Sequence, residues 1–211
     1  MAKILEWIYN AATRVYRYVT RQGSTSITGN ELLEARDLFT AKKADEIGLL
    51  AQELMNGNLS IQQWTLNFRE ELKKIYIDQY MAGRGGLDAM TQADWGSIGG
   101  QLRNQYRYMD RFASDIASGK LSAAQVEARM RLYANSATQA NERGKRVAAG
   151  VPPMPQYPGD GNTVCRSNCH CNWEYVEMDE SWLCYWRLNP AEHCPDCVEN
   201  SERWNPLVFS K

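Results

Sequence analysis

The chain of 211 residues is long enough for one sizeable domain, or for one domain with a small appendage. Its formal net charge is −1, divided as +4 over residues 1–158 and −5 over residues 159–211. Neither part has the strongly basic composition of a dedicated nucleic-acid-binding domain. The chain holds seven Trp and eleven Tyr, and large aromatic side chains anchor interfaces. We therefore expect a protein that binds other proteins.

Residues 3–22 are predicted to form an amphipathic helix, followed by a polar loop at residues 22–30. The apolar side chains of this predicted helix recur on one stripe, at Ile4, Ile8, Ala11, Val15 and Val19. Arginines interrupt this apolar run and no small-residue cleavage site follows it, so the segment is not a secretory signal. No window approaches the roughly 18 consecutive apolar residues of a membrane span.

The arginines of this first helix are accompanied by two tyrosines, giving the set Arg14, Tyr16, Arg17, Tyr18 and Arg21. Such a surface could contact a DNA backbone, a membrane surface or an acidic partner. The alternative is a bundle helix whose arginines are simply solvated. We expect the helix to dock on a partner protein, with only weak DNA contact and no membrane contact.

Four further helices are predicted at residues 30–56, 60–82, 92–118 and 122–148. Ala, Leu, Glu, Gln, Arg and Lys predominate in them, and apolar residues recur at intervals of three and four. Thr91 and Asp94 have the spacing of a capping box, which opens the helix at residue 92. The Gly-Arg-Gly-Gly sequence at residues 83–86 ends the preceding helix.

An internal repeat with an offset of 62 residues supports these helices. The segment GNLSIQQ at residues 57–63 aligns with GKLSAAQ at residues 119–125, and each contains a Gly-containing turn followed by an S-x-x-Q capping box. The same offset aligns apolar positions, pairing Ile47 with Met109, Leu50 with Phe112, Leu54 with Ile116, Trp64 with Val126 and Phe68 with Met130. Short turns make neighbouring helices antiparallel, so the pattern predicts two helical hairpins in one bundle. The alternative is convergence between two ordinary capped hairpins.

The composition changes after residue 150. Residues 151–158, VPPMPQYP, are predicted to form an extended Pro-rich strap that Met154 and Tyr157 hold against another surface. A tight turn at residues 158–161 follows. Alternating residues then predict two strands, at 172–177 and 182–188, joined by a turn at 178–181. The sequence thus divides into a helical bundle at 1–150, the strap at 151–158 and a small β-hairpin module at 159–211.

Five cysteines flank this hairpin, at positions 165, 169, 171, 194 and 197. Cys194 and Cys197 form a C-x-x-C knuckle, whose thiolates suit one edge of a tetrahedral zinc ion. We predict a structural zinc site formed by Cys165, Cys169, Cys194 and Cys197. Cys171 is the runner-up ligand, in place of Cys165 or Cys169. One or two disulfides, or buried free thiols, are the alternatives.

Three further residues near the knuckle have less specific signals. His170 and His193 adjoin ligand cysteines and could substitute for one, but such a histidine is more often a neighbour than a ligand. Cys184 lies in an apolar, aromatic run and is predicted to be a core residue. Four thiolates close the coordination sphere, which argues against a catalytic metal.

Signatures of catalysis are missing from the sequence. The chain has no phosphate-binding loop, dinucleotide fingerprint, H-E-x-x-H motif or nucleophile elbow. Because both histidines lie beside predicted ligands, a histidine general base elsewhere is excluded. We therefore expect a non-enzymatic protein with no small-molecule substrate.

Several segments together resemble a known family. The most specific are Y-P-G-D-G at residues 157–161, N-C-x-C-x-W at 168–173 and A-E-H-C-P-x-C at 191–197, and the similarity covers about residues 95–200. In these segments the chain resembles the minor head proteins of tailed bacteriophages, the group related to the Mu F-like head morphogenesis proteins.

This resemblance implies a virion component, present in the host cytoplasm during assembly. It implies partners among the phage head proteins, namely the portal, the major capsid protein or the scaffold, with several copies in the particle. The alternative function is a zinc-ribbon-like nucleic-acid-binding adaptor. The acidic charge of residues 159–211 speaks against this alternative, because a DNA-binding ribbon should be basic.

Overall fold

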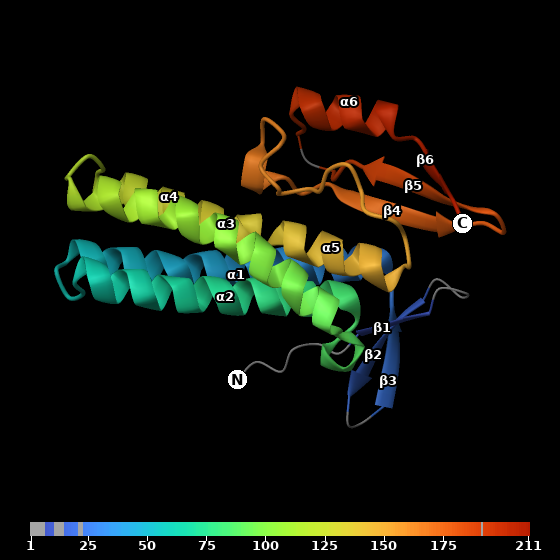
Figure 1. The fold of residues 1–211 in the computed structure, drawn as a ribbon, viewed down its shortest axis with the longest axis horizontal. Coiled ribbons are helices and arrows are strands. Elements are labelled where there is room, and N and C mark those ends of the chain that lie inside the picture. Colours follow the sequence, from blue (N-terminus) through green and yellow to red (C-terminus); the bar gives the residue numbers. More distant parts are fainter. Residues whose placement is uncertain (1–6, 11–14, 21–22, 191) are drawn as a thin grey trace.

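A computed structural model describes residues 7–10, 15–20, 23–190 and 192–211. It confirms a mainly helical protein with a small C-terminal β-hairpin region and a cysteine cluster. Figure 1 shows a long helical bundle with the C-terminal elements packed along one side. The helices of the bundle are α1 (Gly29–Met55), α2 (Ile61–Arg84), α3 (Gln92–Ala117), α4 (Ala123–Ser136) and α5 (Thr138–Ala148). A short 3-10 helix, η1 (Leu87–Ala89), precedes α3.

Capping boxes open the first four of these helices. The predicted boxes at Ser60, Thr91 and Ser122 are all present, with Gln63, Asp94 and Gln125 as the reciprocal partners. A fourth box, in which Thr28 is paired with Glu31, opens α1. Each box satisfies backbone N–H groups that have no acceptor inside the helix, so the starts of the helices are fixed locally.

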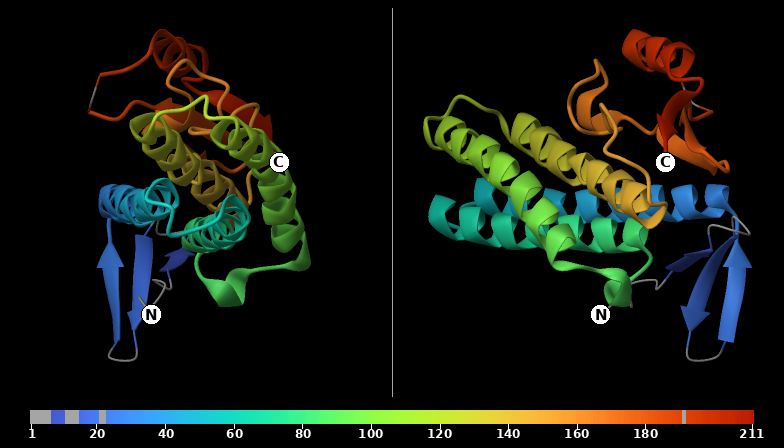
Figure 2. Two further views of the ribbon diagram at one scale, coloured as in Figure 1. Left: turned by 90° about the vertical axis from the view of Figure 1, so that its left-hand side faces the viewer. Right: turned by 45° about the vertical axis from the view of Figure 1, so that its right-hand side comes forward.

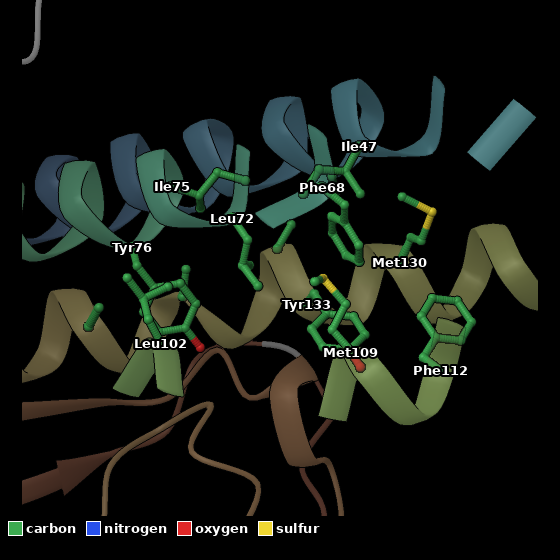
Figure 3. Close-up of a cluster of buried hydrophobic side chains, with 14 of the residues drawn as sticks. Ile47, Phe68, Leu72, Ile75, Tyr76, Leu102, Met109, Phe112, Met130 and Tyr133 are labelled. Carbon is green, nitrogen blue, oxygen red and sulfur yellow. The ribbon is translucent and has the colours of Figure 1, made fainter. Parts of the chain in front are cut away.

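The core of the bundle buries the aligned positions of the repeat. Ile47 and Met109 are both buried, as are Trp64 with Val126 and Phe68 with Met130, whereas Leu50, Leu54 and Ile116 are partly buried against this core. Figure 3 shows Phe68, Phe112 and Tyr133 converging from different helices. The ring centroids of Phe68 and Tyr133 lie 5.3 Å apart in an edge-on arrangement, a geometry that aromatic pairs prefer.

The helix predicted at residues 122–148 is interrupted at Ala137, where α4 ends and α5 begins. Ala137 keeps helical dihedral angles, so the chain does not reverse there. The backbone N–H of Ala137 bonds to the carbonyl of Ala134, and the hydroxyl of Ser136 donates to the carbonyl of Tyr133. The Ser136 hydroxyl thus competes with backbone N–H groups for the Tyr133 carbonyl, and this competition interrupts the regular helical hydrogen bonds.

α2 and α5 approach each other closely at two glycines. A Cβ atom added to Gly83 would lie 2.0 Å from the carbonyl oxygen of Asn141, and one added to Gly144 would lie 2.4 Å from that of Tyr80. The prediction that residues 83–86 end this helix is confirmed, because α2 continues to Arg84 and no further. Gly85 forms the left-handed C-cap, with φ of 101°.

The prediction of a helix at residues 3–22 was wrong for the described part of that segment. Residues there form β1 (Trp7–Asn10) and β2 (Val15–Thr20), and the predicted polar loop contains β3 (Gly23–Ile27). Aromatic and β-branched residues dominate β1 and β2, and such residues favour strands. Figure 2 shows this antiparallel sheet, in the order β1-β2-β3, at the end of the bundle where α1 begins. Arg17 lies in β2, while Ile4, Ala11, Arg14 and Arg21 lie outside the described residues.

The C-terminal region has a core of its own. The strap at 151–158 has no regular secondary structure, and its Met154 and Tyr157 are buried as predicted. A second antiparallel sheet, in the order β4-β5-β6, comprises β4 (Asn172–Glu177), β5 (Ser181–Arg187) and β6 (Leu207–Ser210), and α6 (Pro195–Arg203) precedes β6. The core of this region is built around three mutually packed indoles, those of Trp173, Trp186 and Trp204.

Among the described residues, no helix combines the length and apolar character needed to cross a membrane.

Candidate metal centre

Two loops bring the predicted ligands together. One contains Cys165 and Cys169, which flank the 3-10 helix η2 (Arg166–Asn168), and the other contains Cys194, the N-cap of α6. The Asp196 carboxylate accepts a hydrogen bond of 2.8 Å from the backbone N–H of Val164, which fixes the first loop to the first turn of α6. The hydroxyl oxygen of Thr163 lies 3.1 Å from the sulfur of Cys165, within hydrogen-bond distance.

Three of the four predicted ligands form one compact group. The sulfurs of Cys165, Cys169 and Cys197 all lie within 4.8 Å of one another. The sulfur of Cys197 is 3.7 Å from that of Cys165 and 3.6 Å from that of Cys169. In a tetrahedral site with a metal–sulfur bond of roughly 2.3 Å, the sulfurs would lie about 3.8 Å apart. The two distances from the Cys197 sulfur therefore match those expected in a tetrahedral metal site.

Cys194 and Cys171 adjoin this group. Burial acts to raise the pKa of Cys194, but hydrogen bonds from Cys197 and Cys165, including those from their backbone N–H groups, lower it overall. Cys171 instead interacts with Cys169, and this contact raises the pKa of the Cys169 thiol. Cys194 thus contacts two members of the group, whereas the recorded contact of Cys171 is with one. A small cavity of about 40 Å³ is lined by all five cysteines.

Burial and crowding disfavour the thiolate forms of Cys165, Cys169 and Cys197. Burial raises the pKa of Cys165 to about 11. Burial also raises the pKa of Cys197, and the neighbouring charge of Cys169 raises it further. A bound dication reverses this preference, because metal ligation keeps thiols deprotonated. The arrangement is therefore suited to holding a metal ion, with each ligand supplied by a protein thiolate.

The two histidines differ in their surroundings. The exposed ring of His170 places its Nδ1 3.5 Å from the Asp37 carboxylate of α1, so that nitrogen faces the bundle. His193 is half-buried beside Cys194 and lines the small cavity. Cys184 is completely buried in the C-terminal core, as predicted, and does not line this cavity.

A buried ionic network connects the metal centre to the bundle. The carboxylate of Glu142, in α5, accepts hydrogen bonds from Arg36 at 3.0 Å and from Lys145 at 2.9 Å. Its other oxygen accepts from the backbone N–H of Trp173 at 3.0 Å. Arg36 also donates to the backbone carbonyl of His170, at 3.3 Å. The segment between Cys169 and the hairpin is thereby attached to two helices of the bundle.

Sequence reasoning missed this network. Glu142 is spaced three residues before Lys145, which predicts an ordinary exposed pair on a helix surface. Its partner Arg36 is 106 positions away in sequence, and no local pattern relates the two residues. Glu142 has no exposed surface at all, a degree of burial that charged residues reach only when they are paired.

Comparison of the chain with known protein families, with curated proteins and with solved structures gives no match.

Proposed function

We propose that the protein is a non-enzymatic structural component of a bacteriophage virion, a minor head or portal-proximal protein. The supporting observation is the cysteine centre, in which three clustered sulfurs adjoin a fourth thiol and the lining of the small cavity offers thiols as the main donors. Such a closed set leaves no coordination position for substrate or water, which is typical of structural sites. The similarity of residues 95–200 to phage minor head proteins supports the same conclusion.

We propose zinc as the metal. Cys165, Cys169 and Cys197 would supply three ligands, and Cys194 the fourth, because it contacts both Cys165 and Cys197. A tetrahedral set of four thiolates suits zinc or iron. Zinc is redox-inert, which fits a role in stabilising a small module whose own core is limited. The metal would hold the η2 loop against α6 and so fix the base of the hairpin.

The protein would act in the phage head, with the portal, the major capsid protein or the scaffold as partners and in several copies. Purified particles tested with an antibody against the chain should contain it, in a complex that survives salt washing. Particles made with Cys197→Ser should contain less of it, whereas Cys184→Ala should leave incorporation unchanged. Complete absence of the chain from particles would contradict the proposal.

A further inference from the structure

A groove with a volume of about 1020 Å³ lies between the bundle and the C-terminal sheet. Side chains of α1, including Leu33 and Leu38, form one wall. Trp173 and Tyr175 of β4 belong to the opposite wall, and Leu188 lies beyond the end of β5. A volume of this size is typical of sites that bind another molecule. In Figure 1, β4 is the strand of its sheet that lies nearest the helices.

β4 has an unpaired edge. Among the described strands it pairs with β5 alone, because the strand order is β4-β5-β6. The backbone N–H of Met178 donates to the carbonyl of Ser181. This bond fixes which residues of β4 direct their N–H groups toward β5 and which direct them away. In this register the N–H groups of Trp173, Tyr175 and Glu177 point away from β5. That of Trp173 donates to Glu142, which confirms the direction.

Tyr175 has an outward backbone N–H at this edge. Within the described part of the chain, its outward backbone N–H has no recorded acceptor beyond the β4–β5 ladder. Its hydroxyl is buried and also lacks a hydrogen-bond partner among the described residues. A buried polar group without a partner costs about 1–3 kcal/mol. A ligand with a carbonyl oxygen at this edge would accept a hydrogen bond from the backbone N–H.

The charges around the groove are largely neutralised by one another. Lys145 is paired with Glu142 at 2.9 Å, and Arg187 with Glu174 at 2.6 Å. His170 faces Asp37, as described above. An anionic or cationic small molecule therefore finds no concentrated opposite charge there. The apolar wall of α1 faces a strand edge, and this combination suits an extended polypeptide with apolar side chains.

We propose that the groove binds an extended segment of a partner protein, which adds to the free edge of β4 as a further strand. Backbone hydrogen bonds to Tyr175 and Glu177 would hold the segment, and its apolar side chains would pack on Leu33 and Leu38. Two neighbouring strands lie about 4.8 Å apart, so the added strand would occupy the groove beside the sheet. The inference is independent of the phage-head proposal.

The test uses the full-length, metal-loaded protein and a displayed library of random 12-residue peptides. We expect enriched peptides that alternate apolar and polar residues and bind in fluorescence anisotropy. Leu38→Lys should weaken their binding at least tenfold. Leu66→Lys on α2 is the matched control, because both leucines are 66% exposed and Leu66 does not line the groove. The control should bind as the wild type does.

Backbone methylation of the selected peptide provides a second readout. Methylating alternate amides in one register should abolish binding, and methylating the other register should preserve it, because only one set faces β4. Binding should also slow hydrogen exchange at the amides of Tyr175 and Glu177. Failure to enrich any peptide whose binding depends on Leu38 would overturn the proposal. Enrichment of helical peptides, or tolerance of methylation in both registers, would overturn it as well.

Discussion

The carboxylate of Glu142 accepts a hydrogen bond from the backbone N–H of Trp173, so a buried side chain of α5 holds the first residues of β4. The same carboxylate is paired with Arg36 and Lys145, whose side chains are 1% and 8% exposed. A buried carboxylate therefore attaches the start of β4 directly to α5.

Replacing Glu142 by Gln should destabilise the protein strongly. Removing one partner of a buried ionic group typically costs about 3–5 kcal/mol, because the remaining charges are left uncompensated. Urea denaturation followed by circular dichroism would measure this loss in the free energy of unfolding. Glu70→Gln is the control, since the exposed Glu70–Lys74 pair should be worth no more than about 1 kcal/mol. Equal stability of the two variants would contradict the prediction.

The two glycines between α2 and α5 should not tolerate a methyl group. Gly83→Ala or Gly144→Ala would force backbone atoms apart, and we expect losses of several kcal/mol, as for other severe overpacking. Gly99→Ala is the control, because its Cβ would meet no atom within 4 Å. There the exchange should stabilise α3 by about 0.5–1 kcal/mol. Thermal unfolding of the three variants would show shifts of opposite sign.

The metal proposal predicts about one zinc ion per chain by elemental analysis. Cys197→Ser and Cys194→Ser should release the metal, and hydrogen exchange should then show that residues 159–211 open before the bundle does. Cys171→Ser should retain the metal, which separates Cys194 from the runner-up ligand. Metal-free protein with disulfides among these cysteines would rule out the site, and retention in Cys194→Ser with loss in Cys171→Ser would exchange the two ligands.

Two buried tyrosines should make the protein sensitive to alkali. Burial raises the pKa of Tyr80 and of Tyr133 to about 12 each, from an ordinary value of 10.0. Between pH 10 and 12 the folded state therefore binds more protons than the unfolded state, so stability falls as pH rises through this window. Below pH 10 both tyrosines are protonated in both states and contribute no pH dependence. Tyr133→Phe should flatten this loss, measured as urea midpoints from pH 8 to 11.5 against the wild type.

Removal of residues 1–27 should leave the bundle folded, because the deletion ends just before Thr28, whose capping box opens α1. We expect helical circular dichroism close to that of the intact chain, but reduced incorporation into particles, since the docking role predicted from the sequence falls on this N-terminal segment. A deletion to residue 32, which removes the box, serves as the comparison and should unravel the start of α1. Normal incorporation of the chain that lacks residues 1–27 would contradict the docking role.

Local signals predicted much of the structure. The helix starts at residues 61, 92 and 123 follow from capping residues, and the strands near 172–177 and 181–187 follow from alternation. The N-terminal error arose because Ile8, Val15 and Val19 fit a helical stripe as well as a strand, and β propensity should have decided between them. Short apolar segments carry this ambiguity in general.

Features that depend on distant contacts were not predictable. β6 pairs with β5 through Leu207 and Cys184, but its sequence follows a Pro and carries no turn signal that relates it to β5. The grouping of Cys165, Cys169 and Cys197 was predictable from spacing, because a knuckle needs a second pair of ligands to complete a tetrahedron. The attachment of His170 and Trp173 to the bundle through Arg36 and Glu142 was not, because it depends on how the two cores meet.

The arrangement of the hairpins bears on how the chain could be divided. α1 packs most extensively on α4, and α2 on α5, so the principal helix contacts run between the hairpins rather than within them. The connection at residues 85–91 lies between α2 and α3, at the edge of this interlocked arrangement. A chain cut there would yield two fragments, each of which exposes the surface that the other covers. Co-expressed fragments should therefore reassemble without a covalent link, which would make this connection a suitable point for inserting a reporter protein.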